Sequence, residues 1–297
     1  MNLQTLPFSF VDVFAREPLS GNGLSVFLLD EELPARVMQR ITQEMRQFET
    51  IFLYRVGASS TFRARIFTME EELPFAGHPI IGAAAVLHSE LHAAAETVLI
   101  EFAMAERTIE VTSRREGKSY FAEMDQGVAT FEAPIVDPAI DPFLEALNLS
   151  RSDLHPSLTP QVVSTGLPYL IVPITANLEH ARIVHQRFEA LLATLGAKFV
   201  YVIDVDRREG RTWDNDGRVE DIATGSAAGP AAAYVVEHGL AAAGESIVIT
   251  QGRFLDRPSE LHAVVRGTSK LGVRVGGQVC LVGNGALRLP SALLQHM

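Results

Sequence analysis

The chain has 297 residues, of which 47% are hydrophobic and 21% charged, a balance typical of soluble proteins with one large domain or two ordinary ones. Its 36 acidic and 25 basic residues give a net charge of −11, which argues against a nucleic-acid partner but not against an anionic metabolite. The single cysteine, Cys280, excludes an intrachain disulfide, and no apolar stretch approaches the ~18 residues of a membrane span.

Alternating apolar and polar residues, and at 24–29 a more buried apolar run, predict strands through much of the first half of the chain. Apolar residues at helical spacing, from Val37 to Met45, predict a helix over 35–46. The predicted strands cover residues 8–14, 24–29 and 62–68 and, after a second helix that follows His78, several segments up to about residue 125.

The second half of the chain repeats features of the first. It follows a Pro- and Asp-rich stretch at 132–143, which we expect to connect two domains. Residues 161–174 echo residues 11–29, because both contain a strand, a Ser/Thr-Gly turn and an apolar strand. The helical stretches that begin at Gly82 and Gly229 are also nearly half the chain apart. This common order indicates a duplicated unit, with chance similarity as the alternative.

Each half has one conspicuously small-sided helix, "GAAAVLH" in the first and "GPAAAYVVEH" in the second. A helix that is apolar on all sides is usually buried. We therefore expect an α+β fold in which each half wraps a sheet around a central helix. The predicted N-terminal half covers residues 1–130 and a C-terminal strand at about 284–297, and the C-terminal half covers residues 131–283.

Gly77, His78 and Pro79 stand at the start of the first of these helices. Proline suits the first helical position, where its missing N–H is not needed, and this places His78 at the N-cap. Gly77 would let the backbone approach a ligand closely. The first N–H groups of a helix lack helical partners and carry the positive end of its dipole, so a carboxylate could bind there. The alternative is an ordinary capping or packing histidine.

The second helix follows Asp221, and Thr224, Gly225 and Ser226 offer N-cap oxygens and accessible N–H groups. Pro230 is expected near the first turn. If the two halves are related by pseudo-twofold symmetry, both helix entrances could face one cleft. The alternative reading of Asp221 is an ordinary turn carboxylate.

Glu49 is an acid among apolar neighbours, between Phe48 and Ile51. Loss of water would raise the pKa of such a carboxyl group. A raised pKa suits a group that takes and returns a proton near neutral pH. The alternative is an exposed glutamate at the start of a strand.

Several long motifs together resemble the PhzF family, named for a phenazine-biosynthesis isomerase. They are "DVFAREPLSGNG", "FETIFL", "RIFTMEEELPFAGHPIIGAA", "VEDIATGSAAGPAAAY" and the closing "GVRVGGQVCLVGNGAL". The resemblance implies the diaminopimelate-epimerase-like fold, with an active site between two similar halves. It also implies acid–base proton transfer without a cofactor, a homodimer, and a glutamate that moves a proton.

The family's functional residues fall on specific positions of this chain. The resemblance implies that Glu49 is the proton-transferring glutamate and that His78, with Gly77 before it, belongs to the site. It implies the same for Asp221 and for Ser226 of the second helix entrance.

Three stretches depart from the family pattern: Phe48 replaces a common serine, "GNG" at 21–23 replaces "GNP", and "TWDNDGRV" at 212–219 replaces a more apolar stretch. These departures leave the substrate open. Related epimerases use two cysteines at their helix entrances. Cys280 lies on a late strand instead, which disfavours a two-thiol racemase.

No metal site is expected. His88 and His92 have the i, i+4 spacing of helical metal ligands but lack a glutamate directly after the first histidine. "DNDG" at 214–217 reads as a turn rather than a calcium loop. "GGQVCLVGNG" at 276–285 reads as a strand pair with tight turns, because no helix follows it as a dinucleotide site requires.

The sequence thus predicts a cofactor-independent isomerase of the PhzF family that acts on a small carboxylated metabolite. Glu49, His78 and Asp221 would be catalytic, and the helix entrances would bind the anion. The alternatives are an amino-acid racemase or epimerase on the same fold and a non-catalytic metabolite-binding protein. The lack of a signal peptide at the N-terminus and the single cysteine fit a cytoplasmic location.

Overall fold

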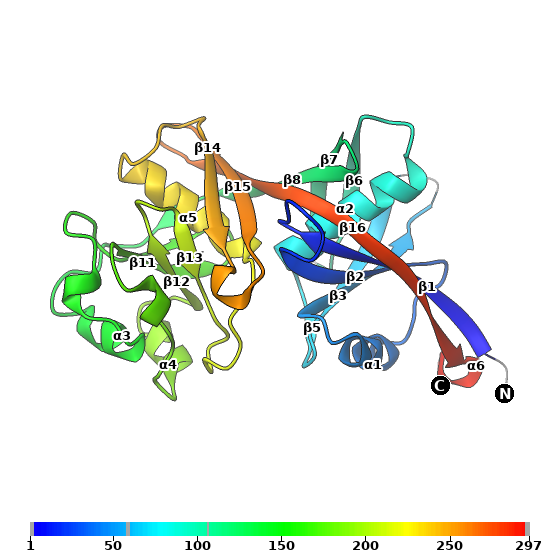
Figure 1. Cartoon of the computed structure of the whole chain (residues 1–297), viewed down its shortest axis with the longest axis horizontal. Coiled ribbons are helices and arrows are strands. Elements are labelled where there is room, and N and C mark those ends of the chain that lie inside the picture. Colours follow the sequence, from blue (N-terminus) through cyan, green and yellow to red (C-terminus); the bar gives the residue numbers. More distant parts are fainter. Residues whose placement is uncertain (1–2, 58–59, 106, 295–297) are drawn as a thin grey trace. The chain divides into compact units, whose positions relative to one another are not determined.

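The computed structural model describes residues 3–57, 60–105 and 107–294 (Figure 1). The chain forms two compact units: unit 1 comprises residues 1–124 and 276–297, and unit 2 comprises residues 125–275. The sequence analysis placed the boundaries between the halves at 130 and at about 284. The observed boundaries, at 124/125 and 275/276, lie several residues earlier. Residues 132–143, which we expected to connect the halves, lie inside unit 2.

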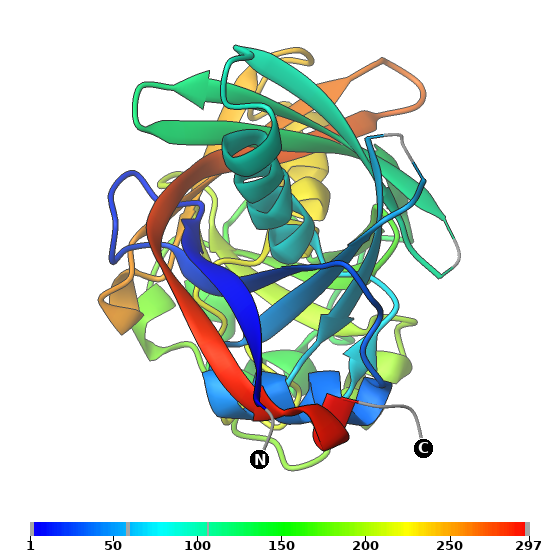
Figure 2. The same cartoon turned by 90° about the vertical axis from the view of Figure 1, so that its right-hand side faces the viewer.

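Unit 1 is a sheet that encloses one helix, α2, and carries further helices at its periphery (Figure 2). Its helices are α1 (Ala35–Met45), α2 (Gly77–Leu91) and α6 (Ser291–Leu294). Its strands are β1 (Leu3–Val13), β2 (Asn22–Leu29), β3 (Glu49–Arg55), β4 (Thr61–Phe67), β5 (Glu72–Leu73), β6 (Thr97–Ala103), β7 (Thr108–Glu116), the first part of β8 (Ser119–Val128) and the second part of β16 (Gly272–Pro290).

Unit 2 is built in the same way around α5 (Figure 1). Its helices are α3 (Asp141–Ala146), α4 (Phe188–Ala193) and α5 (Gly225–Glu237), with short 3₁₀ turns at Arg151–Asp153, Leu178–His180 and Arg253–Leu255. Its strands are β9 (Thr130–Phe131), β10 (Gln161–Ser164), β11 (Pro168–Ile174), β12 (Phe199–Asp204), β13 (Glu209–Arg211), β14 (Ser246–Gln251) and β15 (Ser259–Arg266), with the ends of β8 and β16 that fall in this unit.

The two units share one strand topology. In unit 1 the neighbours β1–β2, β3–β4 and β6–β7 are antiparallel, whereas β2–β3 and β4–β6 are parallel. In unit 2 the neighbours β10–β11, β12–β13 and β14–β15 are antiparallel, whereas β11–β12 and β13–β14 are parallel. The buried helix precedes the fifth strand of this series in both units. The predicted α+β fold of two similar halves is therefore confirmed.

The central helices use small residues because the strands pass close to them. All residues of α2 from Gly77 to His88 are buried. A Cβ atom at Gly82 would lie 2.5 Å from Leu24 Cδ2 and 2.8 Å from Val13 Cγ2, so any larger side chain would force the sheet and the helix apart.

The helix entrances differ in detail from the prediction. Ala76, not His78, is the N-cap of α2, so His78 and Pro79 both lie within the first turn. Proline is tolerated there because the N–H groups of the whole first turn lack helical acceptors. Thr224 is the N-cap of α5, and Pro230 lies inside that helix rather than near its first turn.

The predicted strand pair at 276–285 is wrong, because β16 is one continuous strand. It runs antiparallel to β1 from Leu3 opposite Pro290 to Val13 opposite Val279. Two of its glycines allow close packing rather than turns: a Cβ atom would lie 2.5 Å from the Ala122 carbonyl at Gly276 and 2.5 Å from the Phe8 ring at Gly285. The predicted C-terminal strand at 284–297 is also corrected, because β16 ends at Pro290, α6 follows, and residues 295–297 lie outside the described part.

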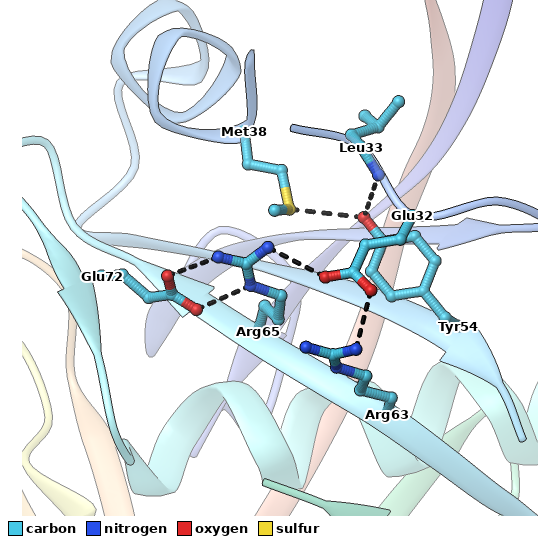
Figure 3. A network of polar contacts seen from close by, with 7 residues as sticks. All are labelled: Glu32, Leu33, Met38, Tyr54, Arg63, Arg65 and Glu72. Carbon is cyan, nitrogen blue, oxygen red and sulfur yellow. Dashed lines mark hydrogen bonds and ion pairs between the residues drawn. The ribbon is translucent and has the colours of Figure 1, made fainter. Parts of the chain in front are cut away.

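The predicted helix at 35–46 is confirmed as α1, which buries Val37, Met38 and Ile41 against the outer face of the sheet. Its packing includes the Tyr54 hydroxyl, which accepts from the Leu33 N–H at 3.1 Å and donates to Met38 Sδ at 3.3 Å (Figure 3).

An ion-pair network lies beside this contact. Arg65 donates two hydrogen bonds to Glu72 and one to Glu32, and Glu32 also accepts from Arg63 (Figure 3). The network joins the segment before α1 to β4 and to β5, which leads into the segment before α2. Because these side chains are largely at the surface, we expect them to order the connections more than to stabilise the fold.

Candidate active site

Two ionisable side chains meet inside unit 1. Glu49 is the first residue of β3 and pairs in parallel register with Leu24 of β2. His78 is the second residue of α2. The fold brings Glu49 Oε2 within 2.9 Å of His78 Nδ1, and each residue is only 5% exposed. The alternative of an exposed glutamate is therefore excluded.

This pair retains hydrogen-bonding capacity. Glu49 Oε2 and His78 Nδ1 lie at ion-pair distance, but their alignment does not make a hydrogen bond. His78 Nε2 is also buried and has no hydrogen-bond partner among the described residues. Most buried polar atoms in folded proteins are hydrogen-bonded, so unsatisfied ones need a reason such as a catalytic role. Depending on its proton, Nε2 can accept from a substrate or donate to it.

The entrance of α5 in unit 2 is held by a different network, which is centred on Gln251. Gln251 Nε2 donates to the main-chain oxygen of Asp221 at 2.7 Å and to Thr224 Oγ1 at 3.0 Å. Gln251 Oε1 accepts from the Tyr201 hydroxyl at 3.0 Å and from the Thr224 N–H at 3.3 Å. Gln251 is 1% exposed, so the centre of this network is shielded from water.

The network determines how the Asp221 carboxylate is held. Thr224 Oγ1 donates to Asp221 Oδ2 at 2.6 Å, so the N-cap hydroxyl binds the carboxylate and makes no capping bond to the helix backbone. The Ala223 N–H approaches the other oxygen at 3.4 Å. Burial, and then the charge of Asp221, raises the pKa of Tyr201, so Tyr201 remains a neutral hydrogen-bond donor.

The first turn of α5 has two further polar contacts. Ser226 Oγ lies 2.7 Å from the Tyr169 hydroxyl. Gln126 Nε2 donates to the Gly225 carbonyl at 2.8 Å, and Gln126 Oε1 accepts from Thr165 Oγ1 at 3.0 Å.

The structure therefore places the predicted site residues in two groups. Glu49, Gly77 and His78 lie in unit 1, and Thr224, Gly225 and Ser226 begin α5 in unit 2 directly after Asp221. That the two helix entrances share one cleft stays a prediction.

The sequence analysis did not identify the residues that support the second group: Gln126, Tyr169, Tyr201 and Gln251. They lie on separate strands, within segments that read only as apolar or alternating, so no local motif could have found them.

Other candidate groups have structural explanations. Both ring nitrogens of His88 are occupied, Nδ1 by Ser113 Oγ at 2.9 Å and Nε2 by the Ala95 carbonyl at 3.1 Å. Asp214 Oδ1 accepts from the N–H groups of Arg218 and Val219, as expected for a turn. The described residues contain no cluster of three or more potential metal ligands from His, Cys, Asp and Glu. In the same part of the chain, no helix has the length and apolarity that a membrane crossing requires.

Residues 11–285 match the family model PhzC-PhzF, described as phenazine biosynthesis-like protein. The chain belongs to this family. It is 33% identical over 295 residues to the trans-2,3-dihydro-3-hydroxyanthranilate isomerase of Pseudomonas chlororaphis, which covers 95% of this chain and 99% of that enzyme. It is also 33% identical over 285 residues to the enzyme of the same name from Pseudomonas aeruginosa, with 93% and 95% covered. The chain is thus an isomerase of the PhzF family.

Solved structures agree with this family fold. A predicted epimerase from Pseudomonas aeruginosa matches with a TM-score of 0.88 and 52% identity, covering 95% of this chain and 99% of that one. A PhzF-family protein from Bacillus anthracis matches with a TM-score of 0.81 and 22% identity over 96% and 99%. A hydroxyproline epimerase from Agrobacterium vitis, at 12% identity over 98% and 93%, has a TM-score of 0.64. The predicted family, enzyme class and diaminopimelate-epimerase-like fold are confirmed.

Proposed function

We propose that this PhzF-family isomerase moves a proton between two carbons of a small carboxylated metabolite, with Glu49 as the group that takes and returns it. The observation that carries the proposal is the buried Glu49–His78 pair, with a separation of 2.9 Å and a free acceptor or donor position on His78. A buried carboxylate next to an imidazole is suited to general acid–base chemistry.

The proposed reaction conserves atoms and electrons. A C–H bond breaks as Glu49 accepts its proton, and the electron pair moves into the substrate's conjugated system. Glu49, whose carboxyl proton exchanges with solvent, then gives a proton to another carbon, where a new C–H bond forms. Because substrate and product are isomers, the step requires no redox partner. General acid–base catalysis typically contributes ~10²–10⁴-fold, so substrate orientation and charge stabilisation must supply the rest.

The other predicted residues have supporting roles in this proposal. His78 orients the Glu49 carboxylate and exchanges a hydrogen bond with the substrate. Asp221, held by Thr224, binds a polar group of the substrate. The main-chain N–H groups at Gly77 and Gly225, with the Ser226 hydroxyl, bind a carboxylate at the positive end of a helix.

We take trans-2,3-dihydro-3-hydroxyanthranilate as the first substrate to test. Two relatives, each 33% identical to this chain, are named isomerases of this compound. Epimerisation is the second candidate, favoured by the 52% identical structure described as a predicted epimerase, and we propose an amino acid as its substrate. Chiral analysis of products from a panel of amino acids would distinguish the two. From the family resemblance we also propose a homodimer, which sedimentation equilibrium would test.

The central experiment replaces Glu49 with Gln, which keeps the shape of the side chain and removes its basicity. In D₂O the wild type should convert trans-2,3-dihydro-3-hydroxyanthranilate, with solvent deuterium entering the product, and Glu49→Gln should lose ~10²-fold or more in kcat. The matched control is Glu44→Gln, an exposed glutamate of α1. An undiminished rate in Glu49→Gln would remove Glu49 from the mechanism.

A further inference from the structure

The shared topology makes it possible to align the two units by strand register. In unit 1 the parallel pair β2–β3 sets Leu24 opposite Glu49, the first residue of β3. In unit 2 the parallel pair β11–β12 sets Tyr169 opposite Phe199, the first residue of β12. Phe199 is therefore the positional counterpart of Glu49, and Tyr169 is the counterpart of Leu24.

The central helices extend this correspondence. His78 is the second residue of α2 and Ser226 is the second residue of α5. In unit 1 the polar contact between a strand and the helix entrance joins Glu49 to His78 at 2.9 Å. In unit 2 the contact with the helix entrance comes instead from β11, the counterpart of β2, and joins Tyr169 to Ser226 at 2.7 Å. One unit thus holds an acid–base pair and the other a pair of hydroxyl groups.

The environment of Tyr169 fixes its hydroxyl group. The residue is 3% exposed, and its ring packs against the Phe199 ring with centroids 5.5 Å apart and planes tilted by 31°. A serine hydroxyl rotates freely unless a neighbour selects its direction. If the buried phenol donates to Ser226 Oγ, the Ser226 proton points away from Tyr169 and can be donated to a ligand.

We propose that Tyr169 is a positioning residue that holds the Ser226 hydroxyl as a donor to a carboxylate oxygen of the substrate. The inference rests on the proposed substrate-binding role of Ser226. It adds to that role the residue that orients the Ser226 hydroxyl group. A donor that is oriented before the ligand arrives binds it at a smaller entropic cost than a free rotor does.

Three single variants and one double variant test this inference. Tyr169→Phe removes only the phenol oxygen, Ser226→Ala removes its partner, and Tyr169→Phe/Ser226→Ala removes both. Tyr234→Phe is the matched control, because Tyr234 lies in α5 as Ser226 does and its hydroxyl donates a hydrogen bond to the Thr159 carbonyl at 2.8 Å. The readouts are kcat and KM for trans-2,3-dihydro-3-hydroxyanthranilate, and crystal structures of each variant.

Loss of one oriented hydrogen bond should raise KM by ~3- to 10-fold in Tyr169→Phe, with kcat little changed. Ser226→Ala should raise KM at least as much, and the double variant should match Ser226→Ala, because Tyr169 acts only through Ser226. Tyr234→Phe should leave KM unchanged. The inference would be overturned if the KM increases of the two single variants multiplied in the double variant. An increase in KM in Tyr234→Phe as large as that in Tyr169→Phe would also overturn it.

The crystal structures separate this inference from the proposed function. In the wild type and in Tyr234→Phe, the Ser226 side chain should occupy one rotamer, whereas Tyr169→Phe should distribute it over several. A single unchanged rotamer in Tyr169→Phe would overturn the positioning role whatever the substrate is. Failure of the proposed substrate alone would show as no turnover by the wild type, with the rotamer change in Tyr169→Phe still present.

Discussion

Glu49 Oε2 lies 2.9 Å from His78 Nδ1, at the point where the first residue of β3 meets the first turn of α2. This contact predicts that His78 serves chemistry rather than folding. His78→Asn keeps a donor toward Glu49 but removes the titratable ring. We expect kcat to fall by ~10²–10⁴-fold while the free energy of unfolding changes by less than about 1 kcal/mol.

The same substitution at His88 is the matched control, since both histidines lie in α2 and are buried. His88→Asn loses the Nε2 contact with the Ala95 carbonyl and the packing of the ring against Tyr120, whose centroid lies 4.8 Å away. It should cost about 1–3 kcal/mol of stability and leave kcat per folded molecule unchanged. Urea unfolding and steady-state kinetics would check both variants, and a reversed pattern would contradict the assignment.

Gly82→Ala should destabilise the protein, although Gly→Ala within a helix usually stabilises by ~1 kcal/mol. The added Cβ atom would lie 2.5 Å from Leu24 Cδ2, and relieving this overlap in a packed core costs about 1–3 kcal/mol. The measurement is the midpoint of chemical unfolding. Gly82→Ala combined with Leu24→Ala should lose less than the sum of the two single variants, whereas simple additivity would show that the overlap is not the cause.

Gln251→Leu should cost about 3 kcal/mol or more, because it leaves the Tyr201 hydroxyl and the Thr224 N–H buried without their acceptor. Adding Tyr201→Phe removes one of these unsatisfied groups and should restore part of the loss. Calorimetric unfolding of the two single variants and the double variant would measure this coupling. A double variant that is less stable than Gln251→Leu would contradict the proposed network.

Stability should fall at high pH in a way that depends on Tyr54. Burial raises the pKa of Tyr54 to about 12 from an ordinary value near 10, so the folded state holds this proton more tightly than the unfolded chain does. The contribution is complete below pH ~10 and is lost as pH rises toward ~12, by at most about 3 kcal/mol. Tyr54→Phe should lose less stability than the wild type between pH 9 and pH 12, as measured by urea unfolding. Parallel curves would refute this assignment.

Local patterns predicted several of the elements and the duplication. The helical spacing from Val37 to Met45 predicted α1, alternating residues predicted β1 and β4, and an apolar run predicted β2. The small residues after Gly82 and Gly229 predicted two buried helices, because a helix with no polar face has no place at the surface. Local reading failed at 276–285, where glycines that suggested turns lie in the continuous strand β16, with Gly276 close to β8 and Gly285 close to β1.

The sequence by itself determined which chemistry this protein can hold, since the identity and order of Glu49, His78, Asp221 and Ser226 follow from the chain and its family motifs alone. Only the tertiary structure decided what each of them contacts. It placed Glu49 in contact with His78, and it placed Gln251 where its side chain donates hydrogen bonds to Asp221 and Thr224. The physical reason is that these contacts join separate strands and helices, whose register and packing depend on the whole sheet and leave no mark in the spacing of neighbouring residues.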